Sequence, residues 1–283
     1  MRRLFVGCVV ACAAGTAFAQ ARKPQCTEGY VVTLEGRALA TSLEATKSTA
    51  ESKAVASSLK AESPFVGRFQ LAQDMSRMEV LSTDFVLPAG TLVLHKAGDK
   101  FYVIADPKTK TYVPMDAAVL LNALEGGAGV VNSEYTAKVA HTTEHKTIAG
   151  TTCRKSIVTI TYVASIPLEN DRILVQRKND IEVWHTPELT SPAALDHFFF
   201  RFQQDKTGAC RKVLGEELGF PMEVNLVVTN AGDGKRASVV QAGSLHAVVT
   251  DAKIDRKLPA EIFQIPPADY TRVDRNPFAA AGR

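Results

Sequence analysis

The stretch TLVLHK-AGD-KFYVIA, residues 91–105, decides the fold class of this chain. Two short runs rich in Val, Leu, Phe and Tyr flank the turn signal Ala97-Gly98-Asp99, as in two antiparallel strands joined by a hairpin. A third run, Thr111 to Pro114, follows a second turn signal at Asp106-Pro107-Lys108. The stretch therefore predicts consecutive β-hairpins.

The same pattern continues on both sides of this stretch. Most of the strand-like runs are joined by links too short for a parallel crossover, which predicts roughly nine to twelve antiparallel strands. Asn230 to Gly234, with Asp-Gly at its tip, predicts a further hairpin turn. The other runs are Tyr30 to Leu34, Val66 to Ala72, Arg77 to Ser82, Glu134 to His145, Cys153 to Val163, Ile173 to Arg177, Asp180 to His185, Glu223 to Thr229, Arg236 to Ala242 and Leu245 to Ile254.

Three segments have helical features. Residues 37–62 predict a weak amphipathic helix or a linker that ends before Pro64. Asp116 caps a short predicted helix, Ala117 to Leu124. Ser191-Pro192 starts another, with an apolar stripe running from Ala194 to Phe202. The predicted fold class is mainly β (α+β): a curved antiparallel sheet or half-barrel with two or three helices packed on one face.

The N-terminus has the layout of a secretory signal peptide. Arg2 and Arg3 precede an apolar stretch, and Ala17-Phe18-Ala19 forms a small-x-small cleavage site. This predicts a signal peptide at 1–19, an N-terminal extension at 20–64, a β-rich half-barrel at 65–272 and a flexible tail at 273–283. The expected location is the periplasm or the exterior. Val9-Val10-Ala11-Cys12 offers an alternative, a lipobox with a lipid anchor on Cys12.

Charge argues against a nucleic-acid partner, and hydropathy argues against a transmembrane helix. The formal net charge is +3, and loss of the two signal arginines leaves +1. No block of five like charges occurs, so we do not expect a nucleic-acid partner. No later segment is long and apolar enough to predict a transmembrane helix.

Cys8 and Cys12 lie in the signal, which leaves Cys26, Cys153 and Cys210. Because thiols oxidise outside the cytoplasm, we expect a Cys153–Cys210 disulfide. The alternative is that each of these cysteines is a small buried hydrophobic residue. No Cys-x-x-Cys pair or nucleophile motif points to a catalytic thiol.

The string His141-Thr-Thr-Glu144-His145 matches one metalloprotease pattern, which requires a helix. Its surroundings alternate and are β-branched, so we expect a solvated strand face and no metal. Gly232 to Arg236 departs from the phosphate-loop pattern and predicts a turn. We therefore expect no catalytic residues and no cofactor, and we keep an exported hydrolase as a minor alternative.

Trp184 predicts either a core anchor or the wall of an apolar pocket. The run Phe198-Phe199-Phe200 poses the same question and is more typical of a core. An open sheet closed by a helix can hold an apolar cavity. The candidate ligand-lining residues are Phe69, Met78, Leu92, Leu94, Tyr102, Ile104, Tyr112 and Trp184.

An ordered set of short segments is similar to a bacterial family of exported proteins known as domain of unknown function 4412. The segments are Lys100 to Tyr112, Thr147 to Cys153, Ile181 to Leu189, Gly219 to Met222, Leu258 to Phe263 and Ile265 to Tyr270. That family resembles the half-barrel of periplasmic lipoprotein carriers, which implies an apolar concave face. It implies no catalytic residues, and residues 37–62 fall outside the similarity.

Two functions follow as expectations. The first is a non-enzymatic envelope protein that binds a hydrophobic ligand, a lipid or an acyl chain, in the half-barrel. The alternative is an envelope structural or protein-interaction module with a filled core, whose partner is another envelope protein.

Overall fold

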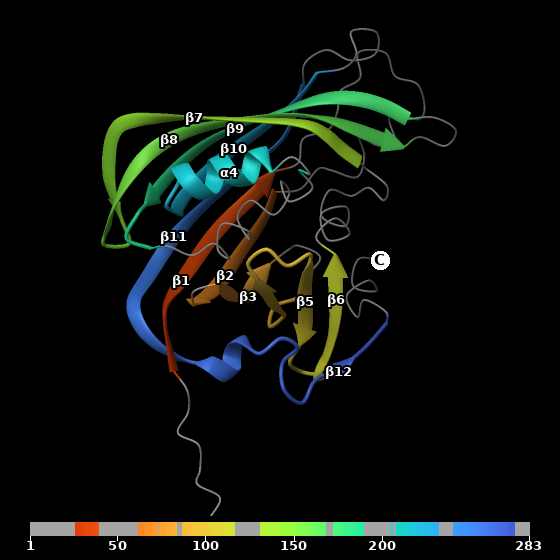
Figure 1. Cartoon of the computed structure of the whole chain (residues 1–283), viewed down its shortest axis with the longest axis vertical. Coiled ribbons are helices and arrows are strands. Elements are labelled where there is room, and N and C mark those ends of the chain that lie inside the picture. The colour runs from red at the N-terminus through yellow and green to blue at the C-terminus, as the bar shows by residue number, and fades with distance from the viewer. Residues whose placement is uncertain are drawn as a thin grey trace, which may run out of the picture.

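A single open, curved sheet organises the part of the chain that the structure, a computed structural model, describes: residues 26–39, 62–72, 74–83, 87–116, 131–167, 172–189, 205, 208–231 and 240–274. Within these residues twelve strands follow the order β12-β6-β5-β4-β3-β2-β1-β11-β10-β9-β8-β7 (Figure 1). Neighbouring strands are antiparallel, except that β12 pairs with β6 in parallel. The predicted mainly β class and the open curved sheet are confirmed.

The first half of the sheet is a meander of short strands. It consists of β1 (Cys26–Leu39), β2 (Glu62–Ala72), β3 (Met75–Thr83), β4 (Leu92–Lys96), β5 (Phe101–Asp106) and β6 (Thr111–Asp116). The hairpins around residues 97–100 and 107–110 occur where the turn signals predict them.

The second half has longer strands and the described helix. It consists of β7 (Val131–Ile148), β8 (Thr151–Pro167), β9 (Arg172–Thr186), α4 (Ala209–Glu217), β10 (Phe220–Ala231), β11 (Val240–Pro259), the 3-10 turn η2 (Ala260–Phe263) and β12 (Thr271–Arg272). Runs predicted as separate strands merge in β9 and in β11, because Lys178-Asn179 and Gly243-Ser244 continue the strand pairing and do not turn.

Three expectations need correction or fall outside the described residues. The prediction of two or three helices is not confirmed, since the described residues hold one short α-helix, α4, at a place where none was predicted. Residues 1–25, 40–61, 117–130 and 190–204 lie outside the described residues. The predicted signal peptide and the predicted helices that begin at Ala117 and Ser191 fall in these ranges. The helix or linker predicted at 37–62 does so too, except for residues 37–39 and 62. Those residues are strand residues of β1 and β2.

The predicted extension at 20–64 is wrong for the described part of that range. β1 pairs with β2 on one side and with β11 on the other, so it is a central strand. At the other end of the chain, Thr271 and Arg272 pair with β6, and the Val273 N–H donates to the Tyr112 carbonyl.

The two faces of the sheet follow from strand register, because adjacent residues in a strand project to opposite sides. We call the side on which α4 packs the concave face (Figure 1). Cys210, Leu214 and Leu218 recur at helical spacing and pack there against residues of β8, β9 and β10. Tracing register across β11 and β1 extends this face to Phe69, Met78 and Ile104.

A C-terminal strap, residues 264–270 between η2 and β12, covers part of the opposite, convex face. Leu92, Leu94, Val103 and Ala105 project there and pack against Tyr112 and the strap residues Ile265 and Tyr270. The strap then ends in β12 beside β6. β4 and β5 are therefore buried on both sides, which explains why their sequences are nearly continuous apolar runs.

The central position of β1 gives a stability prediction. A Cβ added to Gly29 would lie 2.3 Å from the Leu71 carbonyl oxygen, and backbone cannot move aside as a side chain can. Gly29→Ala should therefore lower the free energy of unfolding by about 1–3 kcal/mol, measured by urea denaturation. Gly215→Ala in α4, where a Cβ meets nothing within 4 Å, should raise it by about 0.5–1 kcal/mol. Equal effects would contradict this placement of β1.

Candidate functional site

Register divides the eight predicted lining residues between the two faces. Phe69, Met78, Tyr102 and Ile104 lie on the concave face. Leu92, Leu94 and Tyr112 lie under the C-terminal strap on the convex face. Trp184 also projects from the convex face, because Val183 beside it faces Val224 on the concave side. The eight residues therefore do not form one lining, and four of them remain candidates for the concave face.

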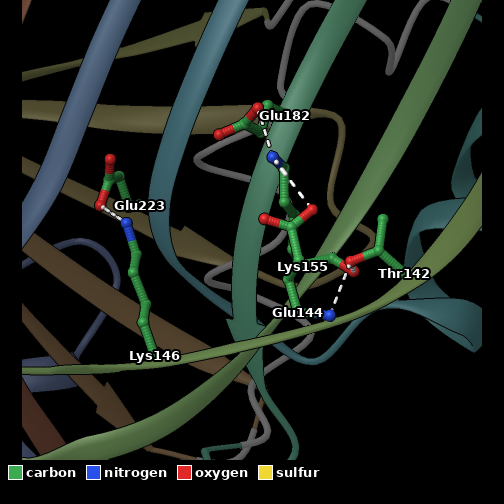
Figure 2. Close-up of polar contacts among 6 residues, drawn as sticks. All are labelled: Thr142, Glu144, Lys146, Lys155, Glu182 and Glu223. Carbon is green, nitrogen blue, oxygen red and sulfur yellow. Dashed lines mark hydrogen bonds and ion pairs between the residues drawn. The ribbon is translucent and has the colours of Figure 1, made fainter.

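Trp184 lies beneath two lysines. Lys146 Nζ is 4.3 Å and Lys155 Nζ is 5.6 Å from the indole ring centroids. Both ammonium groups are also paired with carboxylates, Lys146 with Glu223 and Lys155 with Glu182 at 2.9 Å (Figure 2). The hydrogen bond to Glu182 raises the pKa of Lys155 above its ordinary value.

The contacts around Trp184 hold neighbouring strands together and do not leave its ring free to line a ligand pocket. Lys155 also pairs with Glu144 at 3.4 Å, and Thr142 Oγ1 donates to the Lys155 carbonyl while accepting from the Glu144 N–H (Figure 2). The contacts tie β7, β8, β9 and β10 together around one aromatic ring. Of the two roles predicted for Trp184, the surroundings fit the anchor.

A chain of four side chains links α4 to the sheet. The Gly219 N–H donates to His185 Nδ1 at 2.9 Å, so neutral His185 carries its proton on Nε2, which lies 2.8 Å from Ser156 Oγ. The Ser156 hydroxyl then donates to His141 Nδ1 at 2.9 Å. This places the His141 proton on Nε2, which faces Glu217 Oε2 at 3.7 Å. We call these residues the His185 relay.

The order serine, histidine, glutamate is also that of a hydrolytic triad. Ser156 is 0% exposed, however, and its oxygen already accepts a hydrogen bond from His185. A substrate carbonyl cannot reach a nucleophile in that position. The relay therefore acts as a polar connection between β7, β8, β9 and the end of α4.

No metal site arises from the His141–His145 string. The string lies on β7, as predicted, at an irregularity in the pairing with β8. His141 joins the relay, while His145 is exposed and opposite Arg154. Within the described residues, no three His, Cys, Asp or Glu side chains form a group that could hold a metal ion.

The predicted Cys153–Cys210 disulfide is wrong. Both residues are free thiols, and they belong to different core clusters, Cys153 near Trp184 and Cys210 on α4. Burial raises the pKa of Cys153, and burial together with Asp205 raises that of Cys210 to about 12. Each behaves as the small buried hydrophobic residue that the sequence left as the alternative.

Sequence reasoning missed the relay and α4. Ser156 and His185 are far apart in the chain, and only alternation with apolar neighbours indicated that both face the core. For α4, the spacing of Cys210, Leu214 and Leu218 was the available signal.

No protein-family model matches the chain. No curated protein matches it either. The similarity to domain of unknown function 4412 stays a prediction. None of the described helices is long and apolar enough to cross a membrane.

The His185 relay predicts acid sensitivity. Burial, and then Arg154 and His141, lower the pKa of His185 from 6.5 to about 4. Between these two pH values the unfolded chain binds a proton that the folded protein does not, so stability falls as pH falls. We expect His185 to contribute about 3 kcal/mol to the loss of unfolding free energy between pH 7 and pH 4, measured by urea denaturation.

The His185→Gln variant should lose that part of the pH dependence. His145→Gln, which changes an exposed histidine on β7, should keep it. An unchanged pH profile in His185→Gln would show that the imidazole is not held neutral by its surroundings.

The thiols predict a labelling result. Because Cys153 and Cys210 are buried with raised pKa values, neither should react with a thiol reagent at pH 8 while the protein is folded. Both should react once the protein is unfolded without reductant, as read by peptide mass spectrometry. A linked Cys153–Cys210 peptide in the unreduced digest would overturn this result.

Proposed function

We propose that this protein is an exported, non-enzymatic protein of the bacterial cell envelope that binds a hydrophobic ligand, a lipid or acyl chain, against the concave face. The observation that carries the proposal is the mainly apolar character of that face from β1 to β6, where Ser76 and His95 are buried polar exceptions. The predicted signal peptide and nearly neutral mature charge support a role in the envelope.

The concave face suits a long, flexible ligand. On β3 to β6 it presents Met78, Val93, Tyr102, Ile104, Val113 and Met115, with Leu87 and Val273 at the margin. Methionine side chains adapt to irregular apolar partners. Burying about ten methylene groups at about 0.8 kcal/mol each gives roughly the 8 kcal/mol of a micromolar complex.

A second candidate is the envelope structural or interaction module. Two observations favour it. Tyr102 and Ile104 on the concave face are already fully buried, as in a filled core. On the convex face Val131 and Leu174 flank Ser165 and are 57% and 59% exposed, as in a small contact patch. Ligand binding separates the two candidates.

Two substitutions on β6 test the proposal. Met115→Trp adds bulk on the concave face and should lower affinity for a fluorescent fatty acid at least about tenfold, because the indole occupies the space of the chain. Tyr112→Trp changes the convex face of the same strand and should leave the affinity unchanged. Melting temperature serves as the check on folding.

Native mass spectrometry and lipid extraction of the purified wild-type protein complete the test. Co-purifying lipid and selective loss in Met115→Trp support the proposal. An empty protein that binds no probe would overturn it and favour the interaction module.

A further inference from the structure

Buried asparagines interrupt the apolar concave face at one end. Asn179 on β9 and Asn230 on β10 are 0% and 1% exposed, and Asn132 on β7 is 9% exposed. In the described part of the chain, both amide atoms of Asn179, both of Asn230 and the oxygen of Asn132 have no hydrogen-bond partner. Buried polar groups in folded proteins are otherwise almost always paired.

Register places the three asparagines on the same face. Asn179 lies opposite Ile160 and Val228, which pack with α4 in one cluster. Asn230 lies opposite Arg177, two residues before Asn179 on the same face of β9. Asn132 lies opposite Ala164 of the same cluster. Asn179 and Asn230 are therefore diagonal neighbours on adjacent strands, and we call them the asparagine row. Asn132 is not part of this row, because it lies level with Ala164, four residues from Ile160, and β8 separates it from β9.

Aromatic and cationic groups adjoin this row. Arg177 lies opposite Tyr162, and the Tyr162 ring stacks on Tyr135 at 5.0 Å between centroids. Arg177 is the one charged side chain that register places beside Asn230 among the described residues. The row thus combines amide donors and acceptors with one neighbouring cationic side chain, that of Arg177.

Such a row weakens the folded protein when nothing binds it. An unsatisfied buried amide loses its hydrogen bonds to water without replacement, whereas a leucine of similar shape would not. Polar groups kept under those conditions are typical of binding sites, where stability and function conflict.

We propose that Asn179 and Asn230 form a polar subsite for the head group of an amphiphile whose chain lies along the concave face. The inference rests on the proposed function and adds the chemical class of the ligand. The head group must both donate and accept hydrogen bonds, since each of the Asn179 and Asn230 amides offers an NH₂ and a carbonyl oxygen. Hydroxyl and carboxamide heads meet that requirement.

An ester head does not meet it. An ester only accepts hydrogen bonds, so the amide oxygens of Asn179 and Asn230 would stay unpaired when it binds. Sites built around buried polar groups discriminate strongly against ligands that leave them unpaired. Because the amides are buried, we expect a head group to reach them only when the packing of α4 on this face loosens.

The test compares three oleoyl probes with the same chain: monooleoylglycerol, oleamide and methyl oleate. Wild-type protein should bind the first two at least about tenfold more tightly than the methyl ester, measured by displacement of a fluorescent fatty acid. In Asn179→Leu this preference should disappear, while affinity for methyl oleate is kept. Asn225→Leu, on the convex face of β10, should bind all three as wild type does.

A ligand-free measurement gives a second readout. Asn179→Leu should raise the melting temperature by about 2–4 °C, because it removes an unpaired buried amide. A lower melting temperature would show that the amide is paired in the folded protein and would overturn the inference.

Each failure has a distinct signature. Equal binding of the three probes by wild-type protein would overturn the polar subsite and leave the proposed function standing. Failure to bind any probe would overturn both. A preference that survives in Asn179→Leu and in Asn230→Leu would place the recognition of the head group elsewhere.

Discussion

The pairing of β1 with β11 is the interaction on which the rest of the structure depends. It joins Cys26 to Pro259 at one end and Leu39 to Ser244 at the other, so it links the beginning of the described chain to its last long strand. Without it, β1 and β11 would each present an unpaired edge. With it, two local meanders become one sheet with one continuous concave face. Because these contacts are distant in sequence, closing them has a large entropic cost that long strands must offset.

The concave face also carries buried polar groups, whose burial opposes the stability of the fold. Its middle and β1–β6 end are mainly apolar, whereas its β7–β10 end holds the His185 relay and the row of buried asparagines. The relay satisfies its polar groups with one another, so its members Ser156 and His185 can be buried at modest cost while Glu217 holds the end of α4. The asparagines are not satisfied in this way, which sets them apart as groups that a ligand could complete. On the convex face, the charged groups around Trp184 are paired with one another in ion pairs.

Predictions from sequence succeeded where the information is local. The hairpins around residues 97–100 and 107–110 follow from turn residues between apolar runs, and both are present. Predictions failed where a distant partner decides. Lys178-Asn179 resembles a turn but continues β9, because β8 and β10 pair with it from both sides. Leu92 and Ile104 look equivalent as candidate lining residues, yet the register of β4 on β5 sends them to opposite faces.

The sequence by itself determined the antiparallel, mainly β class, because alternating apolar runs and turn residues act over a few neighbours. The predicted signal peptide and the charge near neutrality are likewise properties of the chain that need no fold. Only the tertiary structure decided that β1 is central, that Cys153 and Cys210 lie in separate clusters, and that Asn179 and Asn230 are buried neighbours. Each of these depends on strand register, and a shift of one residue would move every side chain of a strand to the other face.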